Sequence, residues 1–192
     1  MTQAIAALRQ LVETVGGMEE YNEEALAALE AVCTEITQGC DALERGLAAL
    51  EKALALITGT DNADITDAHN AISALWDAEE TLRAALAQAN SELAVGGAVT
   101  ADTAAQLQAG LAVVLGRYDA AVSSTTALVA QMDLSGLPKL DLDTLRQAAA
   151  YLQSAAEAFA EASRHFRSAV AHLGEALDAL RKINGEMGTI TE

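Results

Sequence analysis

The 192-residue sequence contains a single proline, Pro138, and its aromatic residues make up only 3% of the chain. Sheet proteins are rich in aromatic and β-branched residues, so this composition argues against a β-sandwich or barrel. The apolar residues, 52% of the chain, are mainly alanine and leucine, which favour helices. We therefore predict an all-α protein, and a chain of this length favours one domain spanning residues 1–192.

Basic residues are also scarce, with 11 Lys and Arg against 28 Asp and Glu, a formal net charge of −17. Such a charge opposes binding to phosphates and to anionic lipid headgroups, so we expect no nucleic-acid partner and no membrane partner. Residues 1–5 lack the features of a cleavable signal, and no stretch has the roughly 20 apolar residues of a membrane span. The expectation is a soluble cytoplasmic protein, or one exported without a cleavable signal.

The chain has two cysteines, Cys33 and Cys40, seven residues apart on one expected helix. Their Cα atoms would lie about 10 Å apart, which is too far for a disulfide. We interpret both as buried thiols that pack like small apolar side chains, rather than as redox or metal groups.

Motifs that carry chemistry are missing as well. A ferritin-like di-iron bundle needs two Glu-x-x-His motifs, and the sequence has neither. There is no glycine-rich phosphate loop, nucleophile elbow or Cys-x-x-Cys pair. We interpret His69, His165 and His172 as solvent-facing. Glu79, at a core position, is interpreted as a residue that sets the register or holds water, rather than as a metal ligand. We predict no catalytic, cofactor-binding or metal-binding residues, and hence no enzyme.

What the sequence does contain is a seven-residue apolar repeat in four segments, which is typical of packed helices of the coiled-coil kind. Short connections make neighbouring helices antiparallel, so we predict an elongated up-down-up-down four-helix bundle. A break is possible at the glycine pair 16–17, and Asn184 with Gly185 is expected to end the last helix. The expected helices are about 2–58, 64–95, 100–133 and 141–185.

Charged columns predict the register between the first and last helices. Glu30 and Glu51 share one column of the first helix, and Arg146 and Arg167 share the facing column of the last. Both intervals are 21 residues, so aligning Glu51 with Arg146 also brings Glu30 to Arg167. This register predicts that Arg167→Glu lowers thermal stability and that Glu30→Lys restores it.

The first and last expected helices, about 85 and 69 Å long, exceed the middle two, about 48 and 50 Å. They must project beyond the inner pair, and apolar residues at the projecting end suggest a partner. Either these residues cover one another as a two-helix stalk, or the first helix folds back at the glycine pair 16–17, or a partner covers them. They are Ile5, Leu8, Val12, Val15, Leu177, Leu180 and Ile183.

Trp76 flanks the apolar seam of the second helix, either as a lid on the core or as an interface anchor. A long alanine-rich helical hairpin with a tryptophan near its middle resembles the Trp-x-Gly substrates of type VII secretion and the helical N-terminal modules of toxins secreted that way. Here the motif is residues 73–78 (SALWDA), with Ala78 in place of the family's glycine and a position inside a helix. No tyrosine is followed four residues later by an acidic residue, as the family's export signal requires.

The resulting hypothesis is a non-enzymatic helical interaction module that pairs with another helical protein or with itself. The resemblance implies a bacterial secretion substrate, targeting domain or adaptor. Two alternatives remain open: a coiled-coil spacer in a phage or cell scaffold, and a metal-binding four-helix bundle that lacks the ferritin motif.

Overall fold

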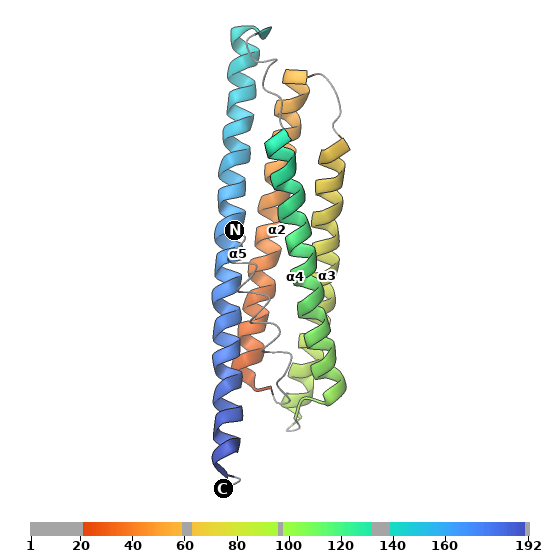
Figure 1. Ribbon diagram of the computed structural model, residues 1–192, viewed down its shortest axis with the longest axis vertical. Helices are drawn as coiled ribbons and strands as arrows, with labels where there is room; N and C mark the ends of the chain where they lie inside the picture. The colour runs from red at the N-terminus through yellow and green to blue at the C-terminus, as the bar shows by residue number, and fades with distance from the viewer. Residues whose placement is uncertain (1–20, 59–62, 96–97, 132–138, 191–192) are drawn as a thin grey trace.

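A computed structural model describes residues 21–58, 63–95, 98–131 and 139–190. In this part of the chain there are four helices and no strand: α2 (Glu23–Thr58), α3 (Ala63–Ala94), α4 (Ala101–Gln131) and α5 (Leu142–Ile190). They form one antiparallel bundle (Figure 1). The predicted all-α four-helix architecture is confirmed.

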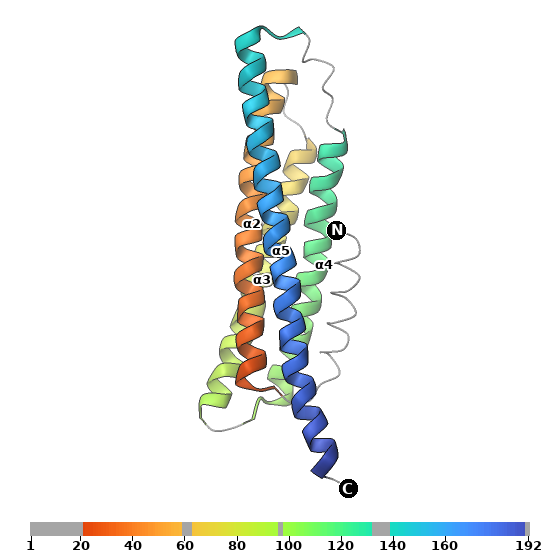
Figure 2. The same cartoon turned by 90° about the vertical axis from the view of Figure 1, so that its left-hand side faces the viewer.

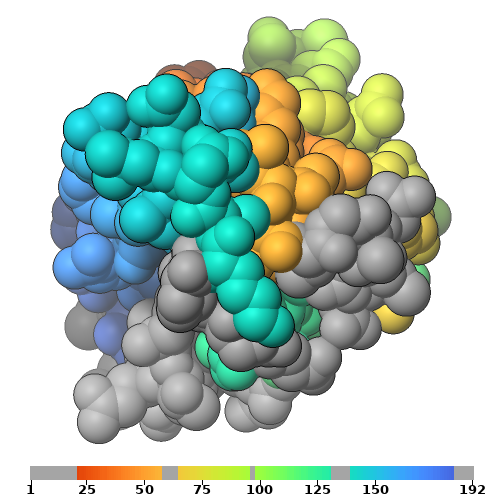
Figure 3. Space-filling view, turned by 90° about the horizontal axis from the view of Figure 1, so that it is seen from above, coloured from red at the N-terminus to blue at the C-terminus, as the bar shows by residue number. Residues whose placement is uncertain are grey.

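Backbone contacts define the order of the helices. Close contacts join α2 to α5, α3 to α4, and α2 to α3, as an up-down-up-down bundle requires. The fourth seam, between α4 and α5, is joined much less closely. In Figure 2, α5 lies in front, between α2 and α4. Figure 3 looks along the bundle from the end at which α5 begins, with the first turns of α5 beside the last turns of α2.

The outer helices are the longest, as predicted: α5 has 49 residues and α2 has 36, against 32 in α3 and 31 in α4. None of these four helices is both long and apolar enough to cross a membrane. The inner helices start and end within two residues of the predicted bounds.

The predicted start of the first helix is wrong in the described part of the chain. Tyr21 and Asn22 are not helical, and α2 begins at Glu23. The side-chain oxygen of Asn22 accepts a hydrogen bond from the backbone N–H of Ala25 at 2.8 Å, so Asn22 is an N-cap. Asn22 interrupts the apolar heptad, but the same frame resumes after it, and the prediction therefore joined the two stretches into one helix. The possible break at residues 16–17 lies outside the described residues.

The predicted end of the last helix is also wrong, because α5 continues through residues 184 and 185 to Ile190. A glycine inside a helix costs only about 1 kcal/mol, which does not oblige the helix to stop. The start of α5 agrees with the prediction. The Asp141 carboxylate accepts hydrogen bonds from the backbone of Asp143 and Thr144 at 3.0 and 2.9 Å, and these bonds hold its pKa below the usual range.

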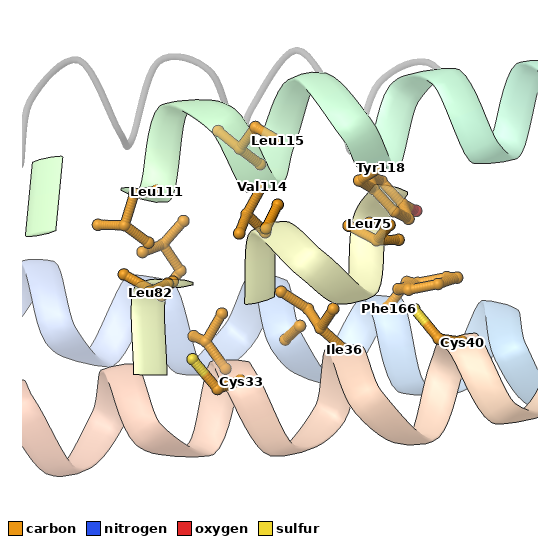
Figure 4. Packing of buried hydrophobic residues seen from close by; sticks show 14 of the residues in the cluster. Cys33, Ile36, Cys40, Leu75, Leu82, Leu111, Val114, Leu115, Tyr118 and Phe166 are labelled. Carbon is orange, nitrogen blue, oxygen red and sulfur yellow. The ribbon is translucent and has the colours of Figure 1, made fainter. Parts of the chain in front are cut away.

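One hydrophobic core runs between the helices and consists mainly of leucine and alanine. Cys33 and Cys40 are fully buried in it, which confirms the predicted burial of both thiols. Figure 4 shows both thiols among side chains of the other helices. Burial raises the pKa of each thiol to about 12.

The register between α2 and α5 differs from the prediction. Phe166 packs at Gly39 and Phe159 packs at Gly46, so the two residue numbers of each pair add up to 205. The predicted pairs, Glu30 with Arg167 and Glu51 with Arg146, add up to 197. The observed alignment is therefore shifted by about eight residues, which is roughly 12 Å along the helix.

The predicted ion pairs are accordingly replaced by others. Glu30 accepts a hydrogen bond from Asn90 of α3, and Arg146 pairs with Asp143 of its own helix. Arg167 donates to the Ser163 carbonyl at 3.1 Å. The pairs that join α2 to α5 include Arg45 with Glu161 at 2.9 Å and Glu24 with Lys182 at 3.7 Å. Exposed ion pairs contribute too little to set a register against the fit of large side chains.

The same shift changes the projecting end. The pair of Lys182 with Glu24 places residue 182 level with the first turn of α2, so only the turns after it extend beyond α2 (Figure 1). Leu177 and Leu180 are buried in the core, and Ile183 is half-buried. The predicted stalk is therefore wrong for its α5 half. Its other half, with Ile5, Leu8, Val12 and Val15, lies outside the described residues.

Candidate functional site

The helix α4 has more apolar surface than its neighbours cover. Only three of its 31 residues are charged: Asp102, Arg117 and Asp119. Val113 and Val129 are 50% and 45% exposed. A helix that is apolar on most sides is normally covered on most sides. This surface therefore points to a further binding element beside α4.

The open seam between α4 and α5 contains an apolar groove of about 310 Å³. It lies where the two helices are least closely joined. A smaller void of about 20 Å³ continues along the same seam and shares Phe166 with the groove. Together they follow α4 from Leu111 to Ala130. The groove is lined by Leu43 of α2, by Val122, Thr125, Thr126, Val129 and Ala130 of α4, and by Phe159, Ala162, Ser163 and Phe166 of α5.

The two threonine hydroxyl groups in this lining are already hydrogen-bonded. Thr125 donates to the Ala121 carbonyl at 2.8 Å, and Thr126 donates to the Val122 carbonyl at 2.7 Å. Such bonds to the preceding turn direct each hydroxyl toward its own helix and leave the threonine methyl group for packing. The groove therefore offers apolar contacts and few free polar groups.

An aromatic pair joins α4 to α5 beside the groove. The rings of Tyr118 and Phe166 lie 4.4 Å apart and are tilted by 59° (Figure 4). Burial raises the pKa of Tyr118 to about 12. The sequence did not predict this contact, since no local pattern relates two residues 48 positions apart.

Each histidine lies against a carboxylate, in a contact that is an ion pair when the imidazole is protonated. His69 lies 2.6 Å from Glu44, and His165 lies 2.8 Å from Glu35. Their side chains are only 34% and 25% exposed, so the expectation that both face solvent is wrong. These pairs tie α2 to α3 and to α5. Within the described residues, no group of three His, Cys, Asp or Glu side chains could hold a metal ion.

Glu92 organises the connection between α3 and α4. Its carboxylate accepts hydrogen bonds from the Thr100 backbone at 2.7 Å, from the Thr103 hydroxyl at 2.7 Å and from Gln88 at 3.0 Å. The backbone bond from Thr100 is the largest cause that lowers the pKa of Glu92, to about 2. Because α4 begins at Ala101, this carboxylate serves as a cap for the start of α4.

Glu79 is a buried carboxylate that is paired within its own helix. It is 8% exposed, and Arg83 one turn later contacts it through Nη2 at 2.6 Å and Nε at 2.9 Å. Glu79 lies close enough to both cysteines for its charge to raise their pKa values. The pairing compensates for part of the cost of burying the charge.

Trp76 is the one predicted interface residue that is both described and exposed, at 43%. It lies in the middle of α3, and its side chain is close enough to Cys40 to offset in part the rise that burial causes in the pKa of that thiol. The indole thus covers one side of the core, as a lid does, and presents its other side to solvent.

No family model, curated protein or solved structure matches this chain. A larger opening, of about 770 Å³, lies between α3 and α4, but its lining includes the polar side chains of Gln88, Glu92 and Asp102. The lining of the groove between α4 and α5 is more apolar. This groove is the best candidate for a functional site.

Proposed function

We propose that this protein is a non-enzymatic interaction module that binds an amphipathic helix of a helical partner in the groove between α4 and α5. The observation that carries the proposal is the groove itself, about 310 Å³ in volume and lined by valine, phenylalanine and methyl-bearing side chains. Helix-in-groove recognition needs such a surface, into which apolar residues of the partner insert at spacings of three and four.

The charge of the chain indicates the chemistry of that partner. A net charge of −17 attracts a helix with basic residues beside its apolar stripe and accelerates their association. Two copies of this chain carry the same charge and repel each other. A different protein with a basic amphipathic helix is therefore favoured over self-association.

Affinity capture from the native cell with three forms of the full chain tests the proposal. Thr126→Lys places a cation in the groove lining, where it opposes a basic helix. Ser123→Lys adds the same charge to an exposed position on α4 that does not line the groove, and it serves as the matched control. We expect the wild-type chain and the control to retain a basic helical protein that Thr126→Lys loses by at least tenfold.

Equal capture by all three forms would remove the groove from the proposal. Light scattering during size exclusion provides the second measurement. A dimer that Thr126→Lys disrupts would identify a second copy as the partner, and a long polymer would favour the scaffold spacer.

The resemblance to type VII substrates extends the proposal to a role as a secreted substrate or adaptor. It is supported by the alanine-rich helical hairpin of α3 and α4 and by Trp76 in the middle of α3. Export is tested by following the intact chain in culture medium with and without the secretion ATPase. Equal amounts in both media would argue against this extension and leave the groove proposal unaffected.

A further inference from the structure

A charged side chain, Arg167, lies at the edge of the groove between α4 and α5. It comes one turn after Ser163 and directly after Phe166, and both of these residues line the groove. Its Nε–H donates to the Ser163 carbonyl at 3.1 Å, and its Nη2 lies 3.5 Å from the Ser163 hydroxyl. The guanidinium is therefore held at the rim of the groove by its own helix.

Arg167 differs from two other arginines of α5 in what surrounds it. Arg146 and Arg181 each pair with an aspartate three residues earlier, at 3.2 and 3.6 Å. None of the positions three and four residues from Arg167 is acidic, since they hold Ser163, Arg164, Val170 and Ala171. In the described part of the chain, no carboxylate lies within ion-pair distance of Arg167. The chain has 28 acidic and 11 basic residues, yet none of its described carboxylates pairs with this one.

The two edges of α5 treat their charges differently. On the edge that faces α2, Glu161 pairs with Arg45 at 2.9 Å, and His165 lies 2.8 Å from Glu35. On the edge that faces α4, the groove is lined by apolar side chains, and Arg167 follows them. Charged groups that face α2 thus have partners within the chain, whereas Arg167 at the groove has no carboxylate partner among the described residues.

The guanidinium of Arg167 is oriented to receive a carboxylate. The bond from Nε–H to the Ser163 carbonyl restrains the plane of the group. The contact of Nη2 with the Ser163 hydroxyl is long, at 3.5 Å, and needs only one N–H. The end formed by Nη1 and Nη2 therefore keeps N–H groups that match the two oxygens of a carboxylate.

We propose that Arg167 binds a carboxylate of the partner helix, an aspartate or glutamate beside its apolar stripe, and so fixes the position of that helix along the groove. The inference rests on the proposed function, because it needs a helix in the groove. The net charge of −17 still attracts a partner that is basic overall. The charge at the rim instead selects register and partner, since a helix with a cation at this level is repelled by Arg167.

Synthetic helical peptides test this inference with the full chain. Each peptide has leucines at spacings of three and four and lysines on the opposite face. One position beside the leucine stripe holds glutamate, and a matched peptide holds glutamine there. Further pairs move this position by one turn at a time and to the other side of the stripe, so that every level of the groove is sampled. Fluorescence anisotropy measures the affinity of each peptide.

We expect one glutamate peptide to bind the wild-type chain about threefold to fivefold more tightly than its glutamine counterpart, as an exposed ion pair allows. Arg167→Gln should remove this preference. Arg164→Gln is the matched control, because it removes the same charge from an exposed position near Glu161, on the other side of α5, and it should keep the preference. In Arg167→Glu, a peptide with lysine at the same position should bind more tightly than the glutamate peptide.

Peptides that bind without any preference for glutamate would overturn the inference and leave the groove proposal intact. A preference that persists in Arg167→Gln would overturn it too, because another cation would then be responsible. If no peptide binds the wild-type chain, the groove proposal fails and the inference falls with it, so the two failures are distinguishable.

Salt provides a second measurement. The preference for glutamate should shrink between about 50 mM and about 500 mM sodium chloride, because ions screen exposed charges. The leucine contacts do not have this dependence, so the glutamine peptide shows how much of the change comes from the lysines alone. A preference that does not change with salt would contradict an ion pair at the rim.

Discussion

The ring of Phe166 on α5 packs directly on Gly39 of α2, with its Cε1 atom 2.6 Å from the position that a Cβ atom on Gly39 would occupy. Phe159 makes the same kind of contact with Gly46. The spacing is seven residues on both helices, so two large knobs enter two glycine holes in successive heptads. A glycine inside a helix costs about 1 kcal/mol relative to alanine. These two glycines allow α5 to approach α2 closely, because they have no side chain that would meet the phenylalanine rings.

Gly39→Ala should therefore lower the stability of the bundle despite the better helix propensity of alanine. The added methyl group overlaps Phe166, and overpacking of this kind costs about 1–3 kcal/mol. Gly116→Ala is the control, because no heavy atom lies within 4 Å of a Cβ there, and it should raise stability by up to about 1 kcal/mol. Urea unfolding measures both. If both alanines stabilise the protein, the Phe166 ring must be able to move away from the added methyl group without loss of stability.

The sequence predicted the helices well because apolar periodicity is a local property of each segment. It did not predict the register of α2 and α5, which depends on the fit of Phe159 and Phe166 into glycines more than 100 residues earlier. The charge columns misled the prediction. Charges repeated at multiples of seven satisfy several registers that differ by one heptad, so such columns cannot select among them.

The groove was not predicted for a different reason. The apolar repeat of α4 looks the same whether its seam with α5 is closed or open. The available signal was the scarcity of charge in α4, where only Asp102, Arg117 and Asp119 interrupt the apolar surface. The prediction that Leu177 and Leu180 lie at a projecting end failed together with the register, because a shift of about eight residues moves both into the core.

Cys33 and Cys40 should resist thiol reagents in the folded protein. Both are fully buried, and burial raises the pKa of each to about 12, so only about 10⁻⁴ of each thiol is ionised at pH 8. We expect a disulfide reagent to modify neither thiol within the time that free cysteine needs to react completely. Both should react at once in concentrated urea. Rapid modification without denaturant would show that the core opens near these residues.

Stability should depend on the ionisation of Glu92. Its pKa is lowered to about 2 in the folded protein, from an ordinary value of 4.5, so the stability that it contributes is fully present above about pH 4.5. That contribution is lost as the pH falls from about 4.5 to 2. Glu92→Gln should therefore be less stable than wild type at pH 7, and the difference should shrink progressively below pH 4.5. Urea unfolding at several pH values measures it, with Glu80→Gln on the same helix as the control. A difference that is constant with pH would contradict the role of the carboxylate.

Arg45 and Glu161 provide a test of the register between α2 and α5. Arg45 Nη2 lies 2.9 Å from Glu161 Oε1, and this hydrogen bond is the main cause that lowers the pKa of Glu161. The side chains are 59% and 35% exposed, so the pair should be worth no more than about 0.2–1 kcal/mol. Arg45→Glu should destabilise the bundle, and Glu161→Arg in the same chain should restore part of the loss. A double-mutant cycle in urea isolates the coupling.

The same cycle with Glu30→Lys and Arg167→Glu is the matched comparison, because those residues would pair only in the register that the charge columns suggested. In the structure, Glu30 instead accepts from Asn90, and Arg167 lies against Ser163 of its own helix. Their coupling should therefore be indistinguishable from zero. Both cycles reverse one charge on each of the same two helices, so each double mutant keeps the net charge of the wild type. The difference in coupling between the two cycles therefore reports the alignment of α2 and α5. Coupling of Glu30 with Arg167 without coupling of Arg45 with Glu161 would mean that the helices pack about eight residues away from the alignment set by Phe159 and Phe166.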